Sequence, residues 1–298
     1  MEYRNIFIAN PAKLSVQRNQ LVIQQEQQFT VPLEDISSIL IESRQVTLTA
    51  SALSAMAEAG VTALLCDERH LPSAVVLPTN QYCRQRKLLL AQVALPKPLQ
   101  KQLWQQIVRQ KIRNQALCLR LLKKQGAETL EALADSVRSG DGDNREAVAA
   151  AAYFPALFGE HFSRELDCLQ NAALNYGYAI LRGCIARNLV VHGLEPCLGL
   201  HHCNAQNNFN LADDLIEPYR PLVDLYVAGN VEPTGELTPM RKQQLFNLTS
   251  YLVKQGQRKY RLMTAVGRCC ASLASCISEQ SKGLELPQMI ALEQRCDE

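Results

Sequence analysis

The stretch PLQKQLWQQIVRQKIRNQALCLRLLKKQG, residues 98–126, separates two parts of the chain that differ in character. Apolar side chains recur along it at roughly helical spacing, at Leu103, Ile107, Ile112, Ala116, Leu119 and Leu122. Such spacing is typical of an amphipathic α-helix, and a glycine just beyond the last apolar residue is a common helix end. The stretch therefore predicts a long basic helix that ends near Gly126.

The residues before this helix contain short runs rich in Ile, Val, Leu and Thr, separated by turn-forming residues. The runs are NIFIA (5–9), LSVQ (14–17), QLVIQQ (20–25), ISSILI (36–41), TALLC (62–66) and SAVVLP (73–78). Runs of this composition, bounded by Asn, Gly and Pro, predict β-strands. One helix is expected among them, over residues 49–60, because TASALSAMAEAG has a Thr or Ser cap, good helix formers and a closing glycine.

The residues after the long helix show helical patterns and no convincing strand pattern. The candidate helices cover residues 128–139, 144–158, 165–193 and 241–255. Prolines interrupt the chain around residues 79–98, where a connection between domains is expected. The chain has 298 residues, which is enough for two domains. We therefore predict an α+β protein with a small N-terminal β domain (1–80), a linker (81–98) and a larger all-α C-terminal domain (99–298).

Basic and acidic residues are segregated along the chain, although the formal net charge is only +2. Residues 71–127 contain eleven Lys and Arg but no acid, and residues 237–278 contain seven Lys and Arg but no acid. Acids gather between residues 128 and 236. Two basic blocks around an acidic centre suit a polyanion, such as nucleic acid, that is held while chemistry takes place elsewhere. Solvated helix faces are the alternative interpretation.

The N-terminus, MEYRNIFIAN, lacks the basic-then-apolar pattern of a signal peptide, and no apolar stretch approaches the roughly 20 residues of a membrane span. We therefore expect a cytoplasmic protein without membrane contact. The eleven cysteines are irregularly spaced, mostly have apolar neighbours and form no CxxC pair. They are expected to be mostly reduced core thiols.

The stretch GLHHCNAQNNFNLADDLIEPYRPLVD, residues 199–224, concentrates polar side chains. Asn210 is a candidate N-cap of the short helix that follows it. Within that helix Asp213 and Asp214 lie four and three residues before Glu217, so carboxylates converge on one face and repel one another. A basic partner such as Arg220 or a divalent cation would relieve this repulsion. Pro218 is expected to bend or break the helix directly after Glu217.

A histidine together with carboxylates is compatible with Mg²⁺ or Mn²⁺, the metals that assist phosphodiester chemistry. Histidine favours manganese slightly. A zinc site made by His201, His202, Cys197 and Cys203 is the rival, but the cysteine spacing matches no familiar zinc module. A polar loop with a capped helix is the structural alternative.

A further carboxylate is available in GDGDNREAVAAAAYFPALFG, residues 140–159. Glu146 follows a turn-like segment and begins a helix rich in small residues, which lets another helix or a nucleic-acid backbone come close. Taken alone, Glu146 is also a favourable first-turn acid for a helix dipole.

Three segments together resemble a known family: NREAVAAAAYFPALFG, LNYGYAILR and GLHHCNAQNNFNLADDLIEPYRPLVD. They are similar to the CRISPR-associated integrase, the first of the adaptation proteins, and most closely to its form in type II systems, whose effector is a single RNA-guided nuclease. VPLEDISSILIE and WQQIVRQKIRNQALCL extend the resemblance, so it covers most of the chain in the same order.

The resemblance implies a metal site made by a glutamate, a histidine and an acid. The family glutamate falls on Glu146, although this chain has Ala147 where the family has glycine. The family histidine lies fifteen residues before an acid, which selects His202 over His201 and pairs it with Glu217. Asp214 matches a further family acid and is an additional candidate ligand.

The implied activity is the insertion of short pieces of foreign DNA into a CRISPR array. A prespacer 3′-hydroxyl attacks a phosphodiester at the border of a repeat, assisted by Mg²⁺ or Mn²⁺ on Glu146, His202 and Glu217. The implied partners are double-stranded DNA, a second copy of the chain, and the second adaptation protein in a heterohexamer; the effector nuclease is a further candidate. A nuclease that only hydrolyses DNA and a non-catalytic nucleic-acid-binding assembly protein remain as alternatives.

Positions in the basic segments suggest four DNA contacts, Lys111, Arg113, Arg145 and Lys242. These residues combine a positive charge with a place near the predicted site or in an acid-free block.

Overall fold

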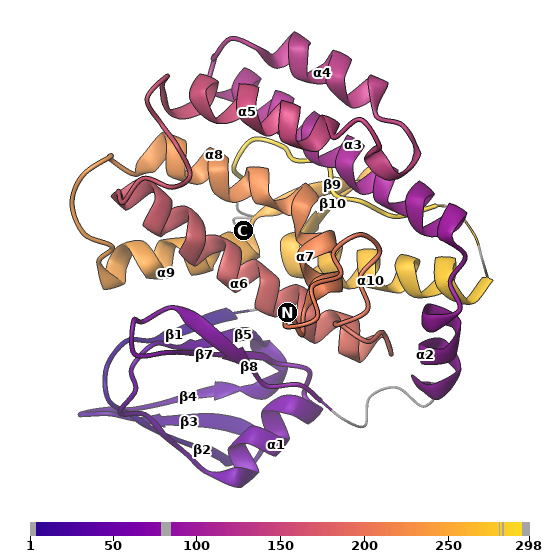
Figure 1. Ribbon diagram of the computed structural model, residues 1–298. Helices are drawn as coiled ribbons and strands as arrows, with labels where there is room; N and C mark the ends of the chain where they lie inside the picture. Colours follow the sequence, from indigo (N-terminus) through magenta and orange to yellow (C-terminus); the bar gives the residue numbers. More distant parts are fainter. Residues whose placement is uncertain (1–3, 79–84, 280, 282, 294–298) are drawn as a thin grey trace.

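A computed structural model describes residues 4–78, 85–279, 281 and 283–293. Strands occupy the N-terminal part of the chain, and helices make up most of the remainder (Figure 1). The predicted fold class, a β region followed by a larger helical region, is confirmed. In the described part of the chain, no helix combines the length and apolar character that crossing a membrane requires.

The N-terminal strands form two four-stranded sheets. Their order is β1-β5-β7-β8 in one sheet and β4-β3-β2-β6 in the other. The strands are β1 (Arg4–Ile8), β2 (Lys13–Gln17), β3 (Gln20–Gln24), β4 (Gln28–Pro32), β5 (Ile36–Ile41), β6 (Thr47–Leu48), β7 (Thr62–Cys66) and β8 (Pro72–Val75). Strands β1, β5 and β7 run parallel. All six predicted runs contain a strand, whereas β4 and β6 were not predicted, because β4 is largely exposed and β6 has only two residues.

Helix α1 (Ala50–Glu58) is the single helix predicted within the β region. The Thr49 hydroxyl caps it by accepting a hydrogen bond from the Ala52 amide at 3.2 Å, as the sequence predicted. Ala52 and Met56 lie four residues apart and are both buried, so they form the inner face of the helix. Gly60 then reverses the chain with φ +80°, a backbone conformation that favours glycine.

The helical region begins with α2 and contains most of the remaining elements. Its helices are α2 (Gln85–Val93), α3 (Lys97–Leu121), α4 (Ala127–Ser136), α5 (Arg145–Phe158), α6 (Leu169–Val191), α7 (Asn210–Ile216), α8 (Arg220–Asn230), α9 (Pro239–Asn247) and α10 (Leu262–Glu279). Short 3-10 helices are η1 (Leu33–Asp35), η2 (Ser139–Asp141), η3 (Glu217–Tyr219) and η4 (Leu248–Ser250). The long basic helix is α3, and it ends before Gly126 because Lys123 already adopts a left-handed conformation, φ 55°.

The helix predicted over residues 241–255 is wrong in its second half. Residues 241–255 were expected to form one helix, but α9 ends at Asn247 and a β-hairpin follows, made of β9 (Leu252–Gln255) and β10 (Arg258–Arg261). Val253 and Gln255 are buried and alternate with less buried neighbours, the period of a strand, and Gly256 makes the turn with φ +60°. The C-terminal region is therefore mainly, but not entirely, helical.

The segment predicted as a linker, residues 81–98, is described from residue 85 onward and contains α2. Leu88 and Gln92 of this helix are buried, and the Gln92 amide donates hydrogen bonds to the carbonyls of Glu195 and Leu198 at 2.9 and 3.0 Å. The helix is thus tied to the helical region. The domain limits 1–80 and 99–298 stay a prediction.

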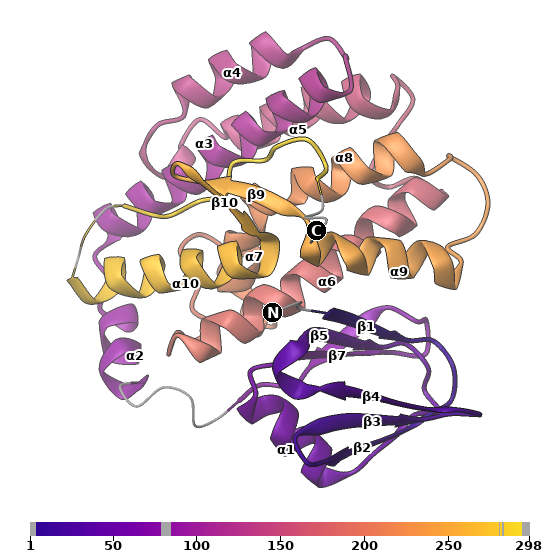
Figure 2. The same ribbon diagram turned by 180° about the vertical axis from the view of Figure 1, so that it is seen from behind.

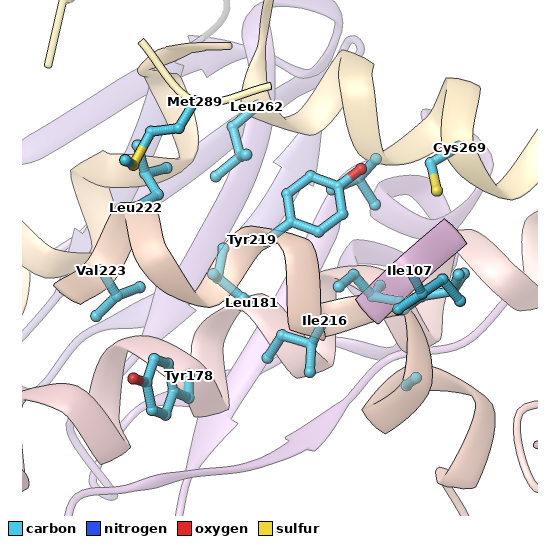
Figure 3. Close-up of a cluster of buried hydrophobic side chains, with 14 of the residues drawn as sticks. Ile107, Tyr178, Leu181, Ile216, Tyr219, Leu222, Val223, Leu262, Cys269 and Met289 are labelled. Carbon is cyan, nitrogen blue, oxygen red and sulfur yellow. The ribbon is translucent and has the colours of Figure 1, made fainter. Parts of the chain in front are cut away.

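Helix α6 packs the helical region against the β region. It lies along the sheet that contains β7 and β8, and Figures 1 and 2 show this contact from opposite sides. Gly183 of α6 allows the close approach, because a Cβ atom there would lie 2.6 Å from Leu64 Cδ2. Leu64 accordingly belongs to the core of the helical region, in which Ile216, Tyr219 and other large side chains pack together (Figure 3).

The cysteines that the structure describes are free thiols. Cys118, Cys184, Cys269, Cys270 and Cys276 are buried, which agrees with the expected core thiols. Burial raises the pKa of Cys184 to about 12, so this thiol stays protonated and unreactive near neutral pH. Cys83 and Cys296 lie outside the described residues.

Candidate metal centre

Two predicted carboxylates come from different elements and meet beside α3. Glu146 lies in the first turn of α5, and Glu217 begins η3 between α7 and α8. The predicted interruption at Pro218 is present as this single 3-10 turn. The Pro218 carbonyl accepts a hydrogen bond from the buried Asn114 amide of α3 at 2.7 Å, which fixes the turn against that helix.

The start of α5 is organised by Asp141, a residue that the sequence analysis missed. Its carboxylate accepts hydrogen bonds from the amides of Arg145 and Glu146 at 2.8 and 3.0 Å. This satisfies donors that every helix N-terminus leaves free. Asp141 thereby sets the position of Glu146, and its place four residues before the helix in a turn-like segment was the available sequence signal.

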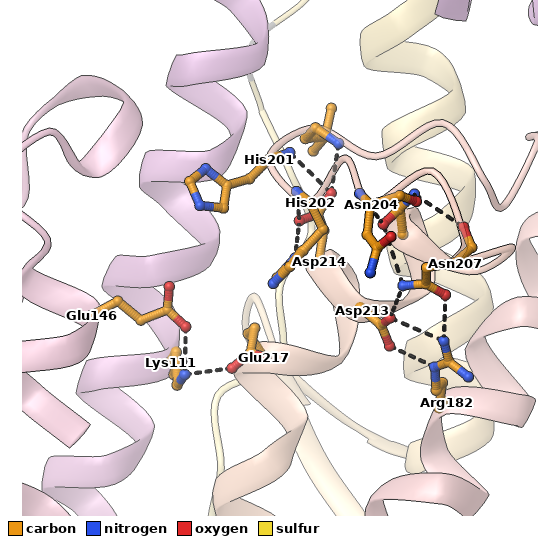
Figure 4. A network of polar contacts seen from close by, with 12 residues as sticks. Lys111, Glu146, Arg182, His201, His202, Asn204, Asn207, Asp213, Asp214 and Glu217 are labelled. Carbon is orange, nitrogen blue, oxygen red and sulfur yellow. Dashed lines mark hydrogen bonds and ion pairs between the residues drawn. The ribbon is translucent and has the colours of Figure 1, made fainter. Parts of the chain in front are cut away.

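Lys111 of α3 occupies the space between the two carboxylates (Figure 4). Its Nζ lies 2.6 Å from Glu146 Oε1 and 2.5 Å from Glu217 Oε2. Arg220 holds the other oxygen of Glu217, with Nε 2.8 Å from Oε1, and so it is the basic partner that the sequence predicted. The acids therefore converge on one cation position, which an ammonium group fills.

Burial and charge oppose each other in this cluster. Burial alone would lower the pKa of Lys111, but Glu217 and Glu146 outweigh it and hold that pKa above its ordinary value. Burial alone would raise the pKa of Glu217, but Lys111 and Arg220 outweigh it and hold that pKa below its ordinary value. All three groups of the Lys111–Glu217–Arg220 cluster are therefore charged near neutral pH.

His202 is oriented by Asp214. His202 Nδ1 lies 2.7 Å from Asp214 Oδ1, and the hydrogen bond to Asp214 raises the pKa of His202, an effect that burial partly offsets. Asp214 is fully buried and also accepts hydrogen bonds from the amides of Leu200, His201 and His202. A carboxylate on one ring nitrogen leaves Nε2 available, which is the usual arrangement of a metal-binding histidine.

The loop over residues 199–209, which precedes α7, is held by a second polar network. Arg182 of α6 binds Asp213 through Nε at 2.6 Å, and Asn207 also binds Asp213, at 2.6 Å (Figure 4). Asn210 was predicted as an N-cap, and this is wrong: it is the first residue of α7, and its buried amide bonds the carbonyls of Cys197, Asn204 and Asn207 instead. The amide therefore organises the loop rather than the helix end.

The zinc alternative is not supported. The His201 ring stacks on Trp104 with centroids 4.3 Å apart, and His202 is turned to Asp214. Within the described residues, no three His, Cys, Asp or Glu side chains are grouped closely enough to hold a metal ion as they stand. For Glu146 and Glu217 the reason is visible, since Lys111 lies between them.

The donor chemistry nevertheless fits a divalent cation. Two carboxylates and an imidazole suit Mg²⁺ or Mn²⁺. Glu217 Oε2 is buried and has no hydrogen bond of good geometry. Its nearest charged group is the Lys111 ammonium, which also pairs with Glu146. A divalent ion in place of that ammonium would bring one more positive charge to the same two carboxylates.

The four predicted DNA contacts lie in different environments. Lys111 belongs to the carboxylate cluster, and its place one helical turn after Ile107 and Val108, on the buried stripe of α3, was the sequence signal for this. Arg113 is exposed and pairs with Asp135 at 3.0 Å. Arg145 is half-buried beside Glu146. Lys242 is buried and pairs with Glu42 at 2.7 Å, a position that does not suit a DNA contact.

Comparison with solved structures identifies the fold. A chain titled "Casposase bound to integration product" matches with a TM-score of 0.76 and 18% identity over 96% of this chain and 93% of its own length. A Cas1 protein from Thermotoga maritima matches with a TM-score of 0.72 and 14% identity over 96% of this chain and all of its own length. At identities this low, the two matches show a shared fold and nothing more.

Sequence comparison identifies the family. The family model described as "CRISPR associated protein Cas1" matches residues 6–260. The CRISPR-associated endonuclease Cas1 of Neisseria meningitidis serogroup C is 47% identical, over 99% of both chains. A second relative, from Pyrobaculum aerophilum, is 28% identical over 74% of this chain and 80% of its own length. The chain belongs to the Cas1 family, which confirms the family resemblance predicted from the sequence.

Proposed function

We propose that this chain is a metal-dependent DNA endonuclease and integrase of CRISPR adaptation. It joins prespacer 3′-hydroxyl ends to the repeat borders of a CRISPR array by transesterification. The observation that supports this most directly is the convergence of Glu146 and Glu217 on one cation position. The name of the Neisseria relative, an endonuclease that is similar over its full length, supports the same activity.

Glu146, His202 and Glu217 are the proposed metal ligands. A divalent ion bound there supplies Lewis-acid stabilisation of the charge that develops on a phosphodiester during attack. Asp214 holds the imidazole of His202 in one orientation through Nδ1, so Nε2 faces away from that carboxylate. The backbone amides of Leu200, His201 and His202 and the His202 ring engage both carboxylate oxygens of Asp214. We therefore assign Asp214 a positioning role instead of a ligand role.

Lys111 has two proposed tasks. Without a metal ion its ammonium neutralises Glu146 and Glu217, which would otherwise repel each other inside the protein. With a metal ion present, the positive charge of Lys111 lies close to where an anionic phosphate would bind. Exposed arginines such as Arg113 are proposed to hold the duplex backbone without reading its sequence.

The proposed partners are double-stranded DNA, a second copy of the chain, and the second adaptation protein in a heterohexamer. A similar fold occurs in a solved "Cas6-RT-Cas1--Cas2 complex", where the match has a TM-score of 0.70 and 17% identity over 98% of this chain and 36% of that one. This likeness of fold supports the proposal of a Cas2 partner. The RNA-guided effector nuclease is proposed as a further partner.

A strand-transfer assay tests the proposed function. The protein is incubated with a 3′-hydroxyl duplex and a supercoiled plasmid that carries a repeat, with Mn²⁺, Mg²⁺ or a chelator. Glu146→Gln should reduce joined product by about 100-fold or more while duplex binding is retained. Glu128→Gln, the same change at an exposed glutamate, should leave joining unchanged.

Other outcomes would favour the alternatives. Cleavage of the plasmid without joined product would favour a nuclease that only hydrolyses DNA. Full activity of Glu146→Gln and His202→Ala would indicate that the protein acts only in binding or assembly.

A further inference from the structure

A cavity of about 440 Å³ lies where the β region meets the helical region. Its walls come from η1, the start of β5, the end of α1, the start of β7, the last turns of α6, η4, the end of β10 and the start of α10. The volume is within the range of small-molecule sites, which are common between domains. The proposed metal ligands Glu146, His202 and Glu217 are not among its lining residues.

Arg187 of α6 lines this cavity and is 8% exposed. Its Nη2 donates a hydrogen bond to the Gly60 carbonyl at 2.7 Å, and its buried Nε has no hydrogen-bond partner. Among the described residues, no Asp or Glu forms an ion pair with it. Burial lowers the pKa of Arg187, since no carboxylate offsets the loss of hydration. A buried positive charge without an anion is costly, and an anionic ligand would remove that cost.

Hydroxyl groups contribute to the remaining walls, at Ser37, Thr62, Thr249, Ser250 and Thr264. The Thr249 hydroxyl already donates to the Phe246 carbonyl at 2.8 Å and is not available to a ligand. The Thr62 hydroxyl is buried and has no hydrogen-bond partner. Arg261 is also a lining residue, and Glu34 is the single acid among the described lining residues and is exposed. Guanidinium and hydroxyl groups together recognise tetrahedral oxyanions.

We propose that this cavity binds a phosphate group, with Arg187 as the charged anchor and Thr62 as a hydroxyl donor. The group belongs either to a phosphorylated small molecule or to a nucleic-acid backbone. Because Arg187 is tied to Gly60, a ligand here joins the last turns of α6 to the β region. The site therefore couples phosphate binding to the contact between the two regions.

Calorimetric titration of the whole protein with inorganic phosphate, at constant ionic strength, tests this site. Saturable binding is expected for the unmodified chain. Arg187→Met should weaken binding by at least about tenfold, because a charge-assisted hydrogen bond is lost. Arg120→Met is the matched control, an exposed arginine that already pairs with Glu131, and it should bind as the unmodified chain does.

Thr62→Val keeps the test valid if Arg187→Met does not fold. Removing an unpartnered buried hydroxyl by an isosteric change should preserve or increase stability, yet phosphate should bind several-fold more weakly. Absence of saturable binding in the unmodified chain, or unchanged affinity in both variants, would overturn the proposal. Glu146→Gln should bind phosphate normally, so the result is independent of the proposed integrase activity.

Competition identifies the source of the phosphate group. Displacement by thymidine 5′-monophosphate but not by a short duplex indicates a small phosphorylated ligand. Displacement by the duplex, together with weaker duplex binding by Arg187→Met, indicates the nucleic-acid backbone. Either result supports the phosphate site.

Discussion

At the scale of single residues, Lys111 is held between two carboxylates that belong to different elements. The sequence predicted that Lys111 contacts DNA, since lysines in an acid-free block suit a polyanion. Its actual neighbours are acids that the local sequence does not contain. A lysine so placed stands where the proposed metal ion would stand, and this leads to a direct test of the metal site.

Lys111→Met should destabilise the metal-free protein by about 3 kcal/mol, because it leaves the buried Glu217 and the half-buried Glu146 without their shared cation. Added Mn²⁺ should then raise the melting temperature of this variant more than that of the unmodified chain, since the metal no longer competes with an ammonium group. Thermal unfolding with and without Mn²⁺ measures both effects.

The control for this test is Lys259→Met, which removes a lysine from an exposed pair with Glu293. Such a pair contributes at most about 1 kcal/mol, so both effects should be small. An equal Mn²⁺ response in Lys111→Met and the unmodified chain would contradict a metal site at this position.

Asp224 predicts a pH dependence of stability. It is buried and accepts hydrogen bonds from the hydroxyls of Tyr153 and Tyr178, and burial raises its pKa from 3.8 to about 6. The folded state therefore keeps a proton that the unfolded state loses, so stability falls as pH rises from about 4 to 6. Asp224→Asn cannot titrate and should remove this loss, which is on the order of 3 kcal/mol.

Urea unfolding of both proteins between pH 4 and 7 measures the difference in the free energy of unfolding. The free energy of unfolding of Asp224→Asn should increase relative to that of the unmodified chain as pH rises. A difference that does not change with pH would show that Asp224 has an ordinary pKa.

At the scale of elements, the first turn of α5 carries a predicted ligand, and its geometry depends on Asp141. Asp141→Ala should cost roughly 2 kcal/mol, because it removes the cap and places a non-glycine, non-Asn/Asp residue at φ 51°. Asp141→Asn should cost less, since asparagine tolerates this conformation and keeps one acceptor. Chemical denaturation measures both.

The matched control is Asp143→Ala, which removes a nearby acid that accepts no helix amide and lies 3.6 Å from Arg138. It should change the free energy of unfolding by less than about 0.5 kcal/mol. Equal costs at Asp141 and Asp143 would contradict the capping role.

The β9–β10 hairpin shows where local patterns failed. Residues 252–255 carry helix-compatible residues and follow a helix, so the helical interpretation was natural. The strand forms because Leu252–Gln255 pairs with Arg258–Arg261 and because Lys254 exchanges backbone hydrogen bonds with Gln288. Gln288 is distant in sequence, so no local window contains this information.

At the scale of the whole molecule, a buried ion pair joins the two regions. Lys242 of α9 binds Glu42, which follows β5, at 2.7 Å, and His70 also contacts Glu42 at 2.9 Å. Lys242→Met should destabilise the protein by about 3 kcal/mol, because Glu42 would lose its main cation inside the protein. Duplex DNA affinity should be unchanged, since Lys242 is buried. Denaturation and a gel-shift titration measure the two effects.

The double variant Glu42→Leu with Lys242→Met distinguishes the loss of the ion pair from the cost of leaving Glu42 unpaired. Because both charges are removed, it should recover much of the lost stability. A double variant that is no more stable than Lys242→Met would contradict this account. Weaker DNA binding by Lys242→Met would support the prediction from the sequence that Lys242 contacts DNA.

The sequence alone determined the order of β and helical regions, most strands, the long basic helix and the Cas1 family. These features follow from local periodicity, capping residues such as Thr49, and motifs that lie within single segments. Glu146, His202 and Glu217 were selected by motif, and their role as ligands stays a prediction.

Only the tertiary structure decided what lies beside each of these residues. It placed Lys111 between the carboxylates, set Asp214 against the His202 ring, buried Lys242 against Glu42, and put Arg187 in a cavity between the two regions. The physical reason is that charge pairing and burial depend on segments far apart in the chain. A pattern reports a residue's own character, whereas its role depends on the partners that folding brings to it.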